Sequence, residues 1–262
     1  MSTIAVASPL STVRAKPGQP AQVRLFPAGR DEASGRFRAV VEIALADGYK
    51  TYWREPGDSG VPTVFDWGAS DNVADVNVRY PVPQRFFDGT GHAIGYLSTV
   101  RFPVEVTPVA AGKAVELRVN IDFGVCRDIC IPEQATVAAT LSDIEQIAGL
   151  WEDAVALTPV TLEPGGTSPV ARASIVGSNL ILTIDGTKGE GAELAGEGIF
   201  LEGPAGWSFG LPVRADHQNG ALFSVPVRHP AFETPVDIDV TLAAGVAEDR
   251  AVETQVKVLP PQ

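Results

Sequence analysis

One stretch organises this chain: VELRVNIDFGVCRDICIP, residues 115–132. Apolar side chains occupy every second position over residues 115–123, an alternation that is typical of a β-strand with one buried face. The stretch then carries the only two cysteines of the 262-residue chain, Cys126 and Cys130, and a second apolar run follows at residues 137–141. The pattern therefore predicts two strands with the cysteines between them.

The spacing of the cysteines restricts how they can pair. In an extended strand, Cα atoms four residues apart lie roughly 13 Å apart, at about 3.3 Å per residue. A disulfide needs Cα atoms within about 7 Å of each other. If Cys126 and Cys130 bridge, residues 127–129 must therefore form a tight turn, with the cysteines facing each other at the end of a hairpin.

A bridge across so short a turn contributes little to stability. Loop-closure entropy supplies about 2 kcal/mol for a loop of roughly five residues, against about 4.7 kcal/mol for a hundred-residue loop. A small disulfide at an edge is the type that cycles between oxidised and reduced forms. We predict a disulfide in the resting protein with a redox role; the alternatives are a local structural disulfide and two unpaired thiols.

Composition favours a mostly β protein of one or two domains. The chain is 45% hydrophobic with 26 glycines and 21 prolines, and short β-branched runs recur along it. No apolar run approaches eighteen residues, so we expect no membrane-spanning helix. Residues 1–10 lack the basic start of a signal peptide. Either an export signal stood upstream and was removed, or the protein is cytosolic.

The net charge of −12 argues against nucleic acid as a partner. The charge is uneven along the chain. Residues 1–140 hold 14 basic and 15 acidic residues, which leaves 6 basic and 17 acidic residues for 141–262. The half with the cysteines is nearly neutral, as expected of a surface that docks protein partners, and the acidic half keeps the protein soluble.

The first half of the chain reads as an immunoglobulin-like β-sandwich, with seven to nine strands and no helix. The run 36–45 alternates cleanly, which predicts an antiparallel strand with one face in water. The Pro- and Gly-containing stretches 55–62 and 81–89 are predicted loops. Further strands are expected at residues 22–26, 64–67, 73–80 and 100–106.

The predicted loop 81–89 holds two adjacent aromatic residues, Phe86 and Phe87, followed by Asp88. Loops generally expose the side chains that they carry. A phenylalanine here either buries itself in its own domain or covers another part of the molecule.

The run Gly57-Asp58-Ser59-Gly60 matches the nucleophile motif of trypsin-like proteases. Those enzymes need a histidine earlier in the chain, whereas all three histidines here follow Ser59. We therefore interpret the run as a turn. The histidines are isolated in sequence, and we expect surface or loop positions for His217 and His229.

One helix and a second β unit complete the prediction. Ser142 and Glu145 have the spacing of a capping box, and the apolar residues from Ile144 to Val155 fall on one helical face. Residues 158–169 are predicted as a linker. Strands are then expected at residues 179–184, 199–201, 222–227, 236–242 and 252–258. The predicted domains are 20–141, a helix and linker at 142–169, and a second β-sandwich at 170–262.

Several motifs in the first half of the chain together resemble a known family. The run from Asp47 through Tyr49, Tyr52 and Arg54, the 86–89 loop, the strand that starts at Arg101, and the cysteine pair with Ile131-Pro132 follow one order. They resemble the N-terminal periplasmic domain of the thiol:disulfide interchange protein DsbD. The resemblance is closer to its relatives in the suppressor-of-copper-sensitivity group, and it covers about residues 22–141.

The resemblance implies a fold, a location and partners. It implies an immunoglobulin-like domain in the periplasm, a possible part in copper tolerance, and a protein-disulfide reductase that needs no cofactor or metal. Reducing equivalents would come from a membrane-embedded electron donor through a thioredoxin-like domain, and would pass on to disulfide isomerases and similar proteins. The chain would be a redox relay more than an independent catalyst.

The resemblance also implies roles for particular residues. Cys126 and Cys130 would be the exchanging pair. Phe86, Phe87 and Asp88 stand at the place of the family's cap loop, which covers the pair until a partner docks. Tyr49 and Tyr52 resemble tyrosines that line the site.

The sequence departs from the family pattern in two ways. Three residues separate the cysteines instead of the five usual in the interchange protein, and the transmembrane and thioredoxin-like parts are absent. Arg127 would lower the pKa of a neighbouring thiol and Asp128 would raise it. Two other functions remain open. One is a copper-binding protein, although Met1 is the only methionine and no histidine is near the cysteines in sequence. The other is a β-sandwich binding or scaffold module with a structural disulfide.

Overall fold

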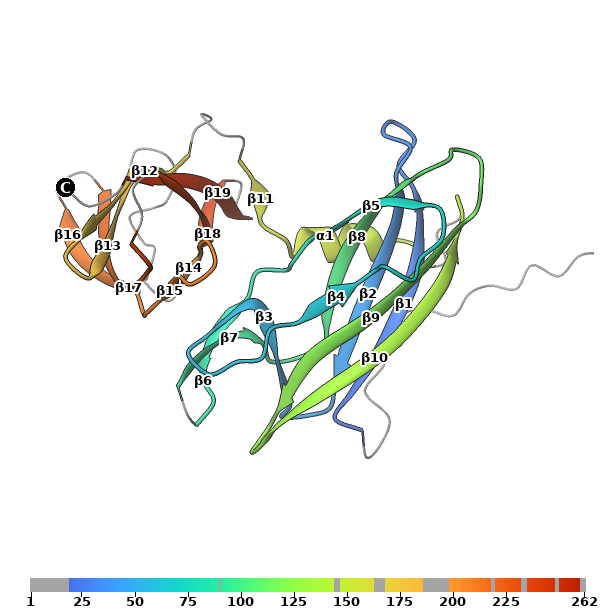
Figure 1. Ribbon diagram of the computed structural model, residues 1–262, viewed down its shortest axis with the longest axis horizontal. Coiled ribbons are helices and arrows are strands. Elements are labelled where there is room, and N and C mark those ends of the chain that lie inside the picture. Colours follow the sequence, from blue (N-terminus) through green and yellow to red (C-terminus); the bar gives the residue numbers. More distant parts are fainter. Residues whose placement is uncertain are drawn as a thin grey trace, which may run out of the picture. The chain divides into compact units, whose positions relative to one another are not determined.

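The computed structural model describes residues 19–89, 91–143, 147–162, 168–185, 198–217, 220–231, 235–247 and 250–259. In these ranges the chain is mainly β, as the sequence predicts, and its one helix is short (Figure 1). Within the same ranges, no helix has the length and apolar character needed to span a bilayer.

The first half of the chain is an immunoglobulin-like β-sandwich, which confirms the predicted class. Its first sheet has the strand order β1-β2-β8-β5, and its second has the order β10-β9-β3-β7-β6 with β4 paired to β9. The strands are β1 (Ala21–Arg30), β2 (Phe37–Leu45), β3 (Lys50–Gly57), β4 (Val64–Asp66), β5 (Val73–Val78), β6 (Gln84–Phe87), β7 (His92–Tyr96), β8 (Val100–Pro108), β9 (Val115–Cys126) and β10 (Cys130–Leu141).

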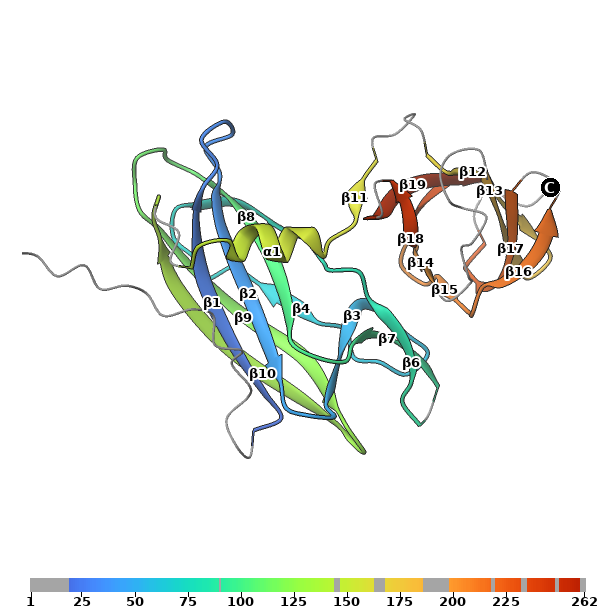
Figure 2. The same cartoon turned by 180° about the vertical axis from the view of Figure 1, so that it is seen from behind.

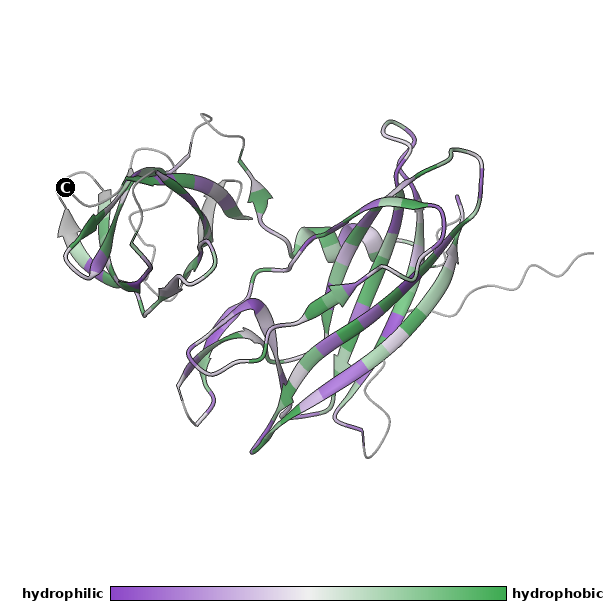
Figure 3. Ribbon diagram, viewed as in Figure 1, coloured by the Kyte–Doolittle hydropathy of each residue, from purple (hydrophilic) through white to green (hydrophobic). Residues whose placement is uncertain are grey.

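The alternating apolar residues 115–123 form the buried face of β9. Every second side chain from Val115 to Phe123 is buried, and the residues between them are exposed or half-buried. Figure 3 shows the resulting bands of hydrophobic and hydrophilic residues along the strand. Antiparallel pairing with β10 runs without a bulge from Leu141 opposite Val115 to Cys130 opposite Cys126. The hydrophobic pattern thus sets the register that brings the cysteines together.

The prediction of one wet face on β2 is wrong. Val40 and Ala44 are buried as well as the residues that alternate with them, and Glu42 is only 2% exposed. Glu42 lies between two arginines of the neighbouring strands. Its carboxylate accepts hydrogen bonds from Arg24 and, at 2.8 Å, from Nε of Arg101. An ion pair on each side makes it possible to bury this carboxylate.

The second face of β2 is buried because helix α1 (Leu150–Ala156) packs on it. Leu150, Trp151 and Ala154 of the helix form one cluster with Val40 and Ala28. Figure 2 shows α1 crossing the outer face of the first sheet. Hydrophobic periodicity in β2 alone does not show that a later segment will cover its other face.

The predicted start of this helix is also wrong. The helix begins at Leu150 and not after Ser142, and its N-cap is Gly149, which makes no side-chain capping bond. Gly149 has φ of 77°, a conformation that glycine adopts without strain. Ile144 and Glu145 lie outside the described residues. The first buried residue of the helix follows Gly149 directly, so the helix begins where its apolar face meets β2.

The second half of the chain is a nine-stranded sheet around one apolar core. Its order is β14-β18-β19-β12-β13-β17-β15, with β11 paired to β19 and β16 paired to β17. The strands are β11 (Val160–Thr161), β12 (Val170–Val176), β13 (Asn179–Asp185), β14 (Ile199–Glu202), β15 (Ser208–Phe209), β16 (Val213–His217), β17 (Gly220–Arg228), β18 (Val236–Ala247) and β19 (Arg250–Leu259). All five predicted strands are present. The predicted linker contains β11, and β12, β15 and β16 were not predicted.

The contacts of the chain divide it into two compact units. The first holds residues up to Arg54 together with Val61–Pro81 and Gly95–Leu157. The second holds Glu55–Gly60, Val82–Ile94 and the chain from Thr158 onward. The cysteines therefore belong to the first unit, and the Phe86-Phe87-Asp88 segment belongs to the second.

Candidate functional site

The two cysteines form a disulfide at the tip of the β9–β10 hairpin (Figure 1). Cys126 is the last residue of β9 and Cys130 is the first of β10, and their Cα atoms lie 4.1 Å apart. Residues 127–129 form the tight turn that the spacing requires. The eleven paired positions below the cysteines place them opposite each other in register.

The two sulfur-bearing residues differ sharply in exposure. Cys126 is 2% exposed, whereas Cys130 belongs to the exposed start of β10. Its neighbours Ile129 and Ile131 are exposed as well, Ile129 to 77%. A thiol arriving from solvent therefore meets Cys130 before Cys126.

Tyr52 of β3 contacts both sulfurs. Its hydroxyl oxygen lies 2.8 Å from Sγ of Cys126 and 3.1 Å from Sγ of Cys130. The sulfurs of a disulfide carry no proton, so the tyrosine hydroxyl is the donor in both contacts. The side chain is fully buried, and Thr63 Oγ1 donates a hydrogen bond of 2.8 Å to the carbonyl oxygen of Tyr52. The ring is thus fixed beneath the disulfide.

Tyr49 lies beside the turn and does not contact the sulfurs in any interaction that the structure records. The guanidinium of Arg127 stands over its ring, 5.1 Å from the centroid. Nε of Arg127 also donates to the Asp128 carboxylate at 3.1 Å. The charges of Arg127 and Asp128 therefore offset each other directly, which weakens the effect of either on a nearby thiol.

Phe86 and Phe87 are in a strand, so the prediction of a loop is wrong for them. They end β6, where extended pairing satisfies the backbone that a loop would leave to solvent. Phe87 is 63% exposed and meets the His92 ring edge-on, with centroids 6.0 Å apart. Phe86 is half-buried. Their predicted role as a cap over the disulfide stays a prediction.

Asp88 holds the turn that follows β6. Its carboxylate accepts hydrogen bonds from Ser59 Oγ at 2.7 Å and from the Gly91 amide at 3.1 Å. Ser59, which the sequence placed in a protease-like motif, thus has a carboxylate as its recorded partner. The predicted loop at residues 55–62 is strand β3 as far as Gly57. Ser59 and Asp88 both belong to the second unit.

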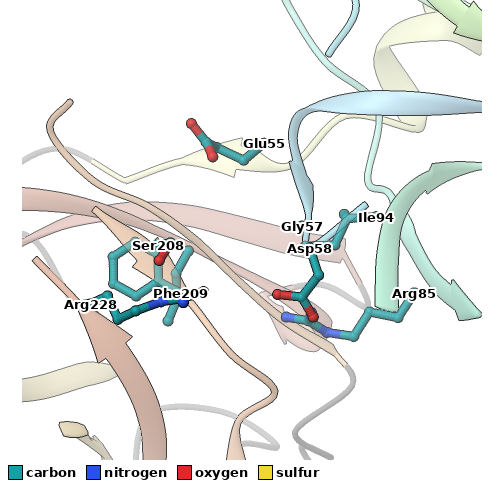
Figure 4. Close-up of a pocket in the computed structure, with 9 residues that line it drawn as sticks. Glu55, Gly57, Asp58, Arg85, Ile94, Ser208, Phe209 and Arg228 are labelled. Atoms are coloured by element: carbon teal, nitrogen blue, oxygen red, sulfur yellow. The ribbon is translucent and has the colours of Figure 1, made fainter. Parts of the chain in front are cut away.

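The second unit also has a pocket of about 250 Å³ (Figure 4). In Figure 4 the Asp58 carboxylate points toward the Arg85 guanidinium, while Arg228 and Ser208 line the opposite wall. The pocket has two acidic and two basic lining residues and no cysteine. It is therefore not part of the disulfide site, and its charges favour neither an anion nor a cation.

Sequence reasoning missed the residues that hold Tyr52. These are Thr63, whose hydroxyl binds the Tyr52 backbone, and Gly124, against which the tyrosine ring packs. The signal for Gly124 was a glycine inside an otherwise regular strand pattern, which often marks a close approach. Among the described residues, no three His, Cys, Asp or Glu side chains cluster so as to hold a metal ion.

Comparison with known proteins gives three findings. Residues 18–142 match the family model of the thiol:disulfide interchange protein DsbD, N-terminal. The crystal structure of the N-terminal periplasmic domain of ScsB from Proteus mirabilis matches with a TM-score of 0.70 and 22% identity, over 94% of this chain and 97% of that one. The reduced N-terminal domain of Neisseria meningitidis DsbD matches with a TM-score of 0.33 and 14% identity, over 49% and 90%. No curated protein matches. At 22% identity the likeness to the Proteus structure shows a shared fold.

Proposed function

Since residues 18–142 belong to the DsbD N-terminal family, we propose that this chain is a periplasmic thiol–disulfide relay. The relay passes reducing equivalents through Cys126 and Cys130 to or from thioredoxin-like proteins. Its upstream donor is a membrane-embedded protein, its acceptors are disulfide isomerases or similar proteins, and its pathway serves copper tolerance. Residues 20–141 are the redox domain, 142–169 the helix and linker, and 170–262 a second β-sandwich domain.

One observation carries this proposal: the disulfide joins one exposed and one buried cysteine at the tip of a hairpin. A bridge that only stabilises the fold gains most by tying distant strands. This one joins residues that the eleven other paired positions of the same hairpin already hold opposite each other. Its stabilising role is therefore small, and its accessible half fits exchange with a partner.

The asymmetry assigns the two sulfurs different steps. In the reduction of the disulfide, a thiolate of the donor attacks Sγ of Cys130. The Cys126–Cys130 bond breaks, and Cys126 leaves as a thiolate. The second donor thiolate then attacks the donor sulfur of the mixed disulfide and releases Cys130. The donor becomes a disulfide, and the pair gains two electrons and two protons.

Delivery follows the reverse sequence through a mixed disulfide between Cys130 and the acceptor. The Cys130 thiolate attacks the disulfide of the acceptor, and one acceptor sulfur leaves as a thiolate and takes a proton. Cys126 then attacks Sγ of Cys130 and displaces the second acceptor sulfur. The pair loses two electrons and two protons, and the acceptor gains them.

The chain's own groups assist at defined atoms. The Tyr52 hydroxyl is placed to donate a hydrogen bond to the sulfur of Cys126 when that sulfur carries charge, and such charge-assisted bonds are stronger than neutral ones. No histidine or carboxylate has a recorded hydrogen bond to either sulfur among the described residues. When the disulfide is reduced, the donor protein therefore supplies the activated thiolate, which fits a relay.

Trapping of a mixed disulfide tests the proposal. The probe is a thioredoxin-fold domain that keeps only its attacking cysteine, activated as a mixed disulfide with a small thiol. Cys126→Ser leaves the exposed Cys130 free and should form a covalent complex on non-reducing gels. Cys130→Ser leaves the buried Cys126 and should trap poorly.

The double variant Cys126→Ser/Cys130→Ser is the control and should form no complex. Equal trapping by the two single variants would show that the turn exposes both sulfurs alike. Preferential trapping through Cys126 would reverse the assigned roles. Absence of any complex with either variant would contradict the relay.

A further inference from the structure

We infer that Gly124 is a positioning residue for the redox pair, because its missing side chain leaves the space in which the Tyr52 ring lies beneath the disulfide. The inference rests on the proposed function and adds to it a residue that does not touch the sulfurs. Gly124 is in β9, two residues before Cys126.

Space and not backbone conformation requires glycine at this position. A Cβ atom built on Gly124 would lie 3.0 Å from Cδ2 and 3.1 Å from Cε2 of Tyr52, and 2.9 Å from Cβ of Val61. Ordinary van der Waals contact begins at about 3.4 Å. The φ angle of Gly124 is not positive, so alanine would fit the backbone. The side chains around it would have to move.

The backbone of Tyr52 cannot easily retreat from such a side chain. β3 lies between β9 and β7 in the sheet. On the β7 side, a Cβ on Gly95 would lie 2.7 Å from Cα of Tyr52 and 2.1 Å from the carbonyl oxygen of Thr51. On the β9 side, Thr51 Oγ1 donates to the carbonyl oxygen of Gly124 itself at 2.9 Å. The backbone of β3 thus packs closely against a glycine on each neighbouring strand, and these contacts limit its movement.

An added methyl group at Gly124 must therefore displace the ring. Val61 is partly exposed and can yield, whereas Tyr52 is fully buried. When the ring yields by turning about its Cα–Cβ bond, Oη moves farther than the pushed ring carbons, because it lies farther from that bond. Such a movement changes the contacts of 2.8 and 3.1 Å that Oη makes with the two sulfurs.

The consequence for chemistry falls on the buried sulfur. Cys126 is 2% exposed, so a thiolate there has little access to water and depends on the donor that the protein supplies. The recorded donor is the Tyr52 hydroxyl. Gly124 thus tunes the reactivity of Cys126 through the position of Tyr52.

Other charged groups near Cys126 stay constant in the test. Lys50 of β3 is paired with Cys126 in register, and Arg127 and Asp128 form the adjoining turn. None of them is altered in the variants below, so a change in titration reports the tyrosine contact.

The experiment is a double-mutant cycle on the full chain in a Cys130→Ser background, where Cys126 is the single thiol. The ultraviolet absorbance of the thiolate is followed against pH for the parent, Tyr52→Phe, Gly124→Ala and the combined variant. Tyr52→Phe should raise the midpoint by about one pH unit, a tenfold loss of thiolate at a fixed lower pH. Gly124→Ala should shift it in the same direction, and the combined variant no further than Tyr52→Phe alone.

An unchanged midpoint in Gly124→Ala, or a shift that adds fully to that of Tyr52→Phe, would overturn the inference. If Gly124→Ala folds but is too unstable to titrate over the pH range, its cost in melting temperature at neutral pH is compared in native and Tyr52→Leu backgrounds. A smaller cost without the ring is expected, and an equal cost would overturn the inference. No partner protein enters these measurements. They can therefore fail while mixed disulfides still form, or succeed while none forms.

Discussion

Reduction of the Cys126–Cys130 disulfide should lower the melting temperature of this protein only slightly. The bridge closes a ring of about five residues, for which the loss of chain entropy in the unfolded state contributes about 2 kcal/mol. In the native protein the hairpin itself keeps the cysteines opposite each other, because β9 and β10 pair over twelve positions up to and including the cysteines. For a chain of this size, about 2 kcal/mol corresponds to a fall of roughly 4–8 °C.

The assay is thermal unfolding followed by circular dichroism or calorimetry, with and without a phosphine reductant. The second unit provides an internal reference, because both cysteines belong to the first unit. If the units unfold in separate transitions, only that of the first should move. A fall of more than about 10 °C would refute the reasoning, since the loop term cannot supply it. The disulfide would then be a major support of the fold.

Two further outcomes are expected. If Phe86 and Phe87 cap the pair, Phe86→Ala or Phe87→Ala should speed the reaction of the reduced protein with a thiol reagent. The control is Val109→Ala, at another exposed apolar residue, which should leave the rate unchanged. Equal rates in all variants would contradict the cap. Trp151→Ala should lower the free energy of unfolding by about 3–5 kcal/mol, since this buried ring packs with Val40 against the outer face of β2. Leu157→Ala, at an exposed position just after the helix, is its control, and a similar loss in both would mean that α1 does not support the sandwich.

The local pattern was sufficient to predict the hairpin and the disulfide. The alternation of β9 determines which face is buried, and cysteines with three residues between them can bridge only across a tight turn. The same alternation misled for β2, because the burial of Val40 depends on a helix more than a hundred residues later in the chain. Hydrophobic periodicity indicates one buried face of a strand. Burial of the other face depends on a tertiary contact that the strand's own sequence does not show.

The remaining differences have similar causes. Ser142 and Glu145 fit a capping box by spacing alone, but the helix starts at Leu150, where apolar residues can reach β2. The run at residues 81–89 has loop composition, yet Phe86 and Phe87 end a short strand. The contact of Tyr52 with both sulfurs joins positions 74 and 78 residues apart, and no spacing rule in one sequence reveals it.

The reduction potential of the Cys126–Cys130 pair tests the central claim most directly. The full chain is equilibrated with glutathione or thioredoxin buffers of defined poise, and the fraction of reduced protein is measured after acid quenching and alkylation. A relay between thioredoxin-like proteins predicts a potential between about −120 and −270 mV, where such proteins exchange electrons reversibly. A potential far below about −300 mV would mean that the bridge resists its proposed donors, and would identify it as a structural disulfide.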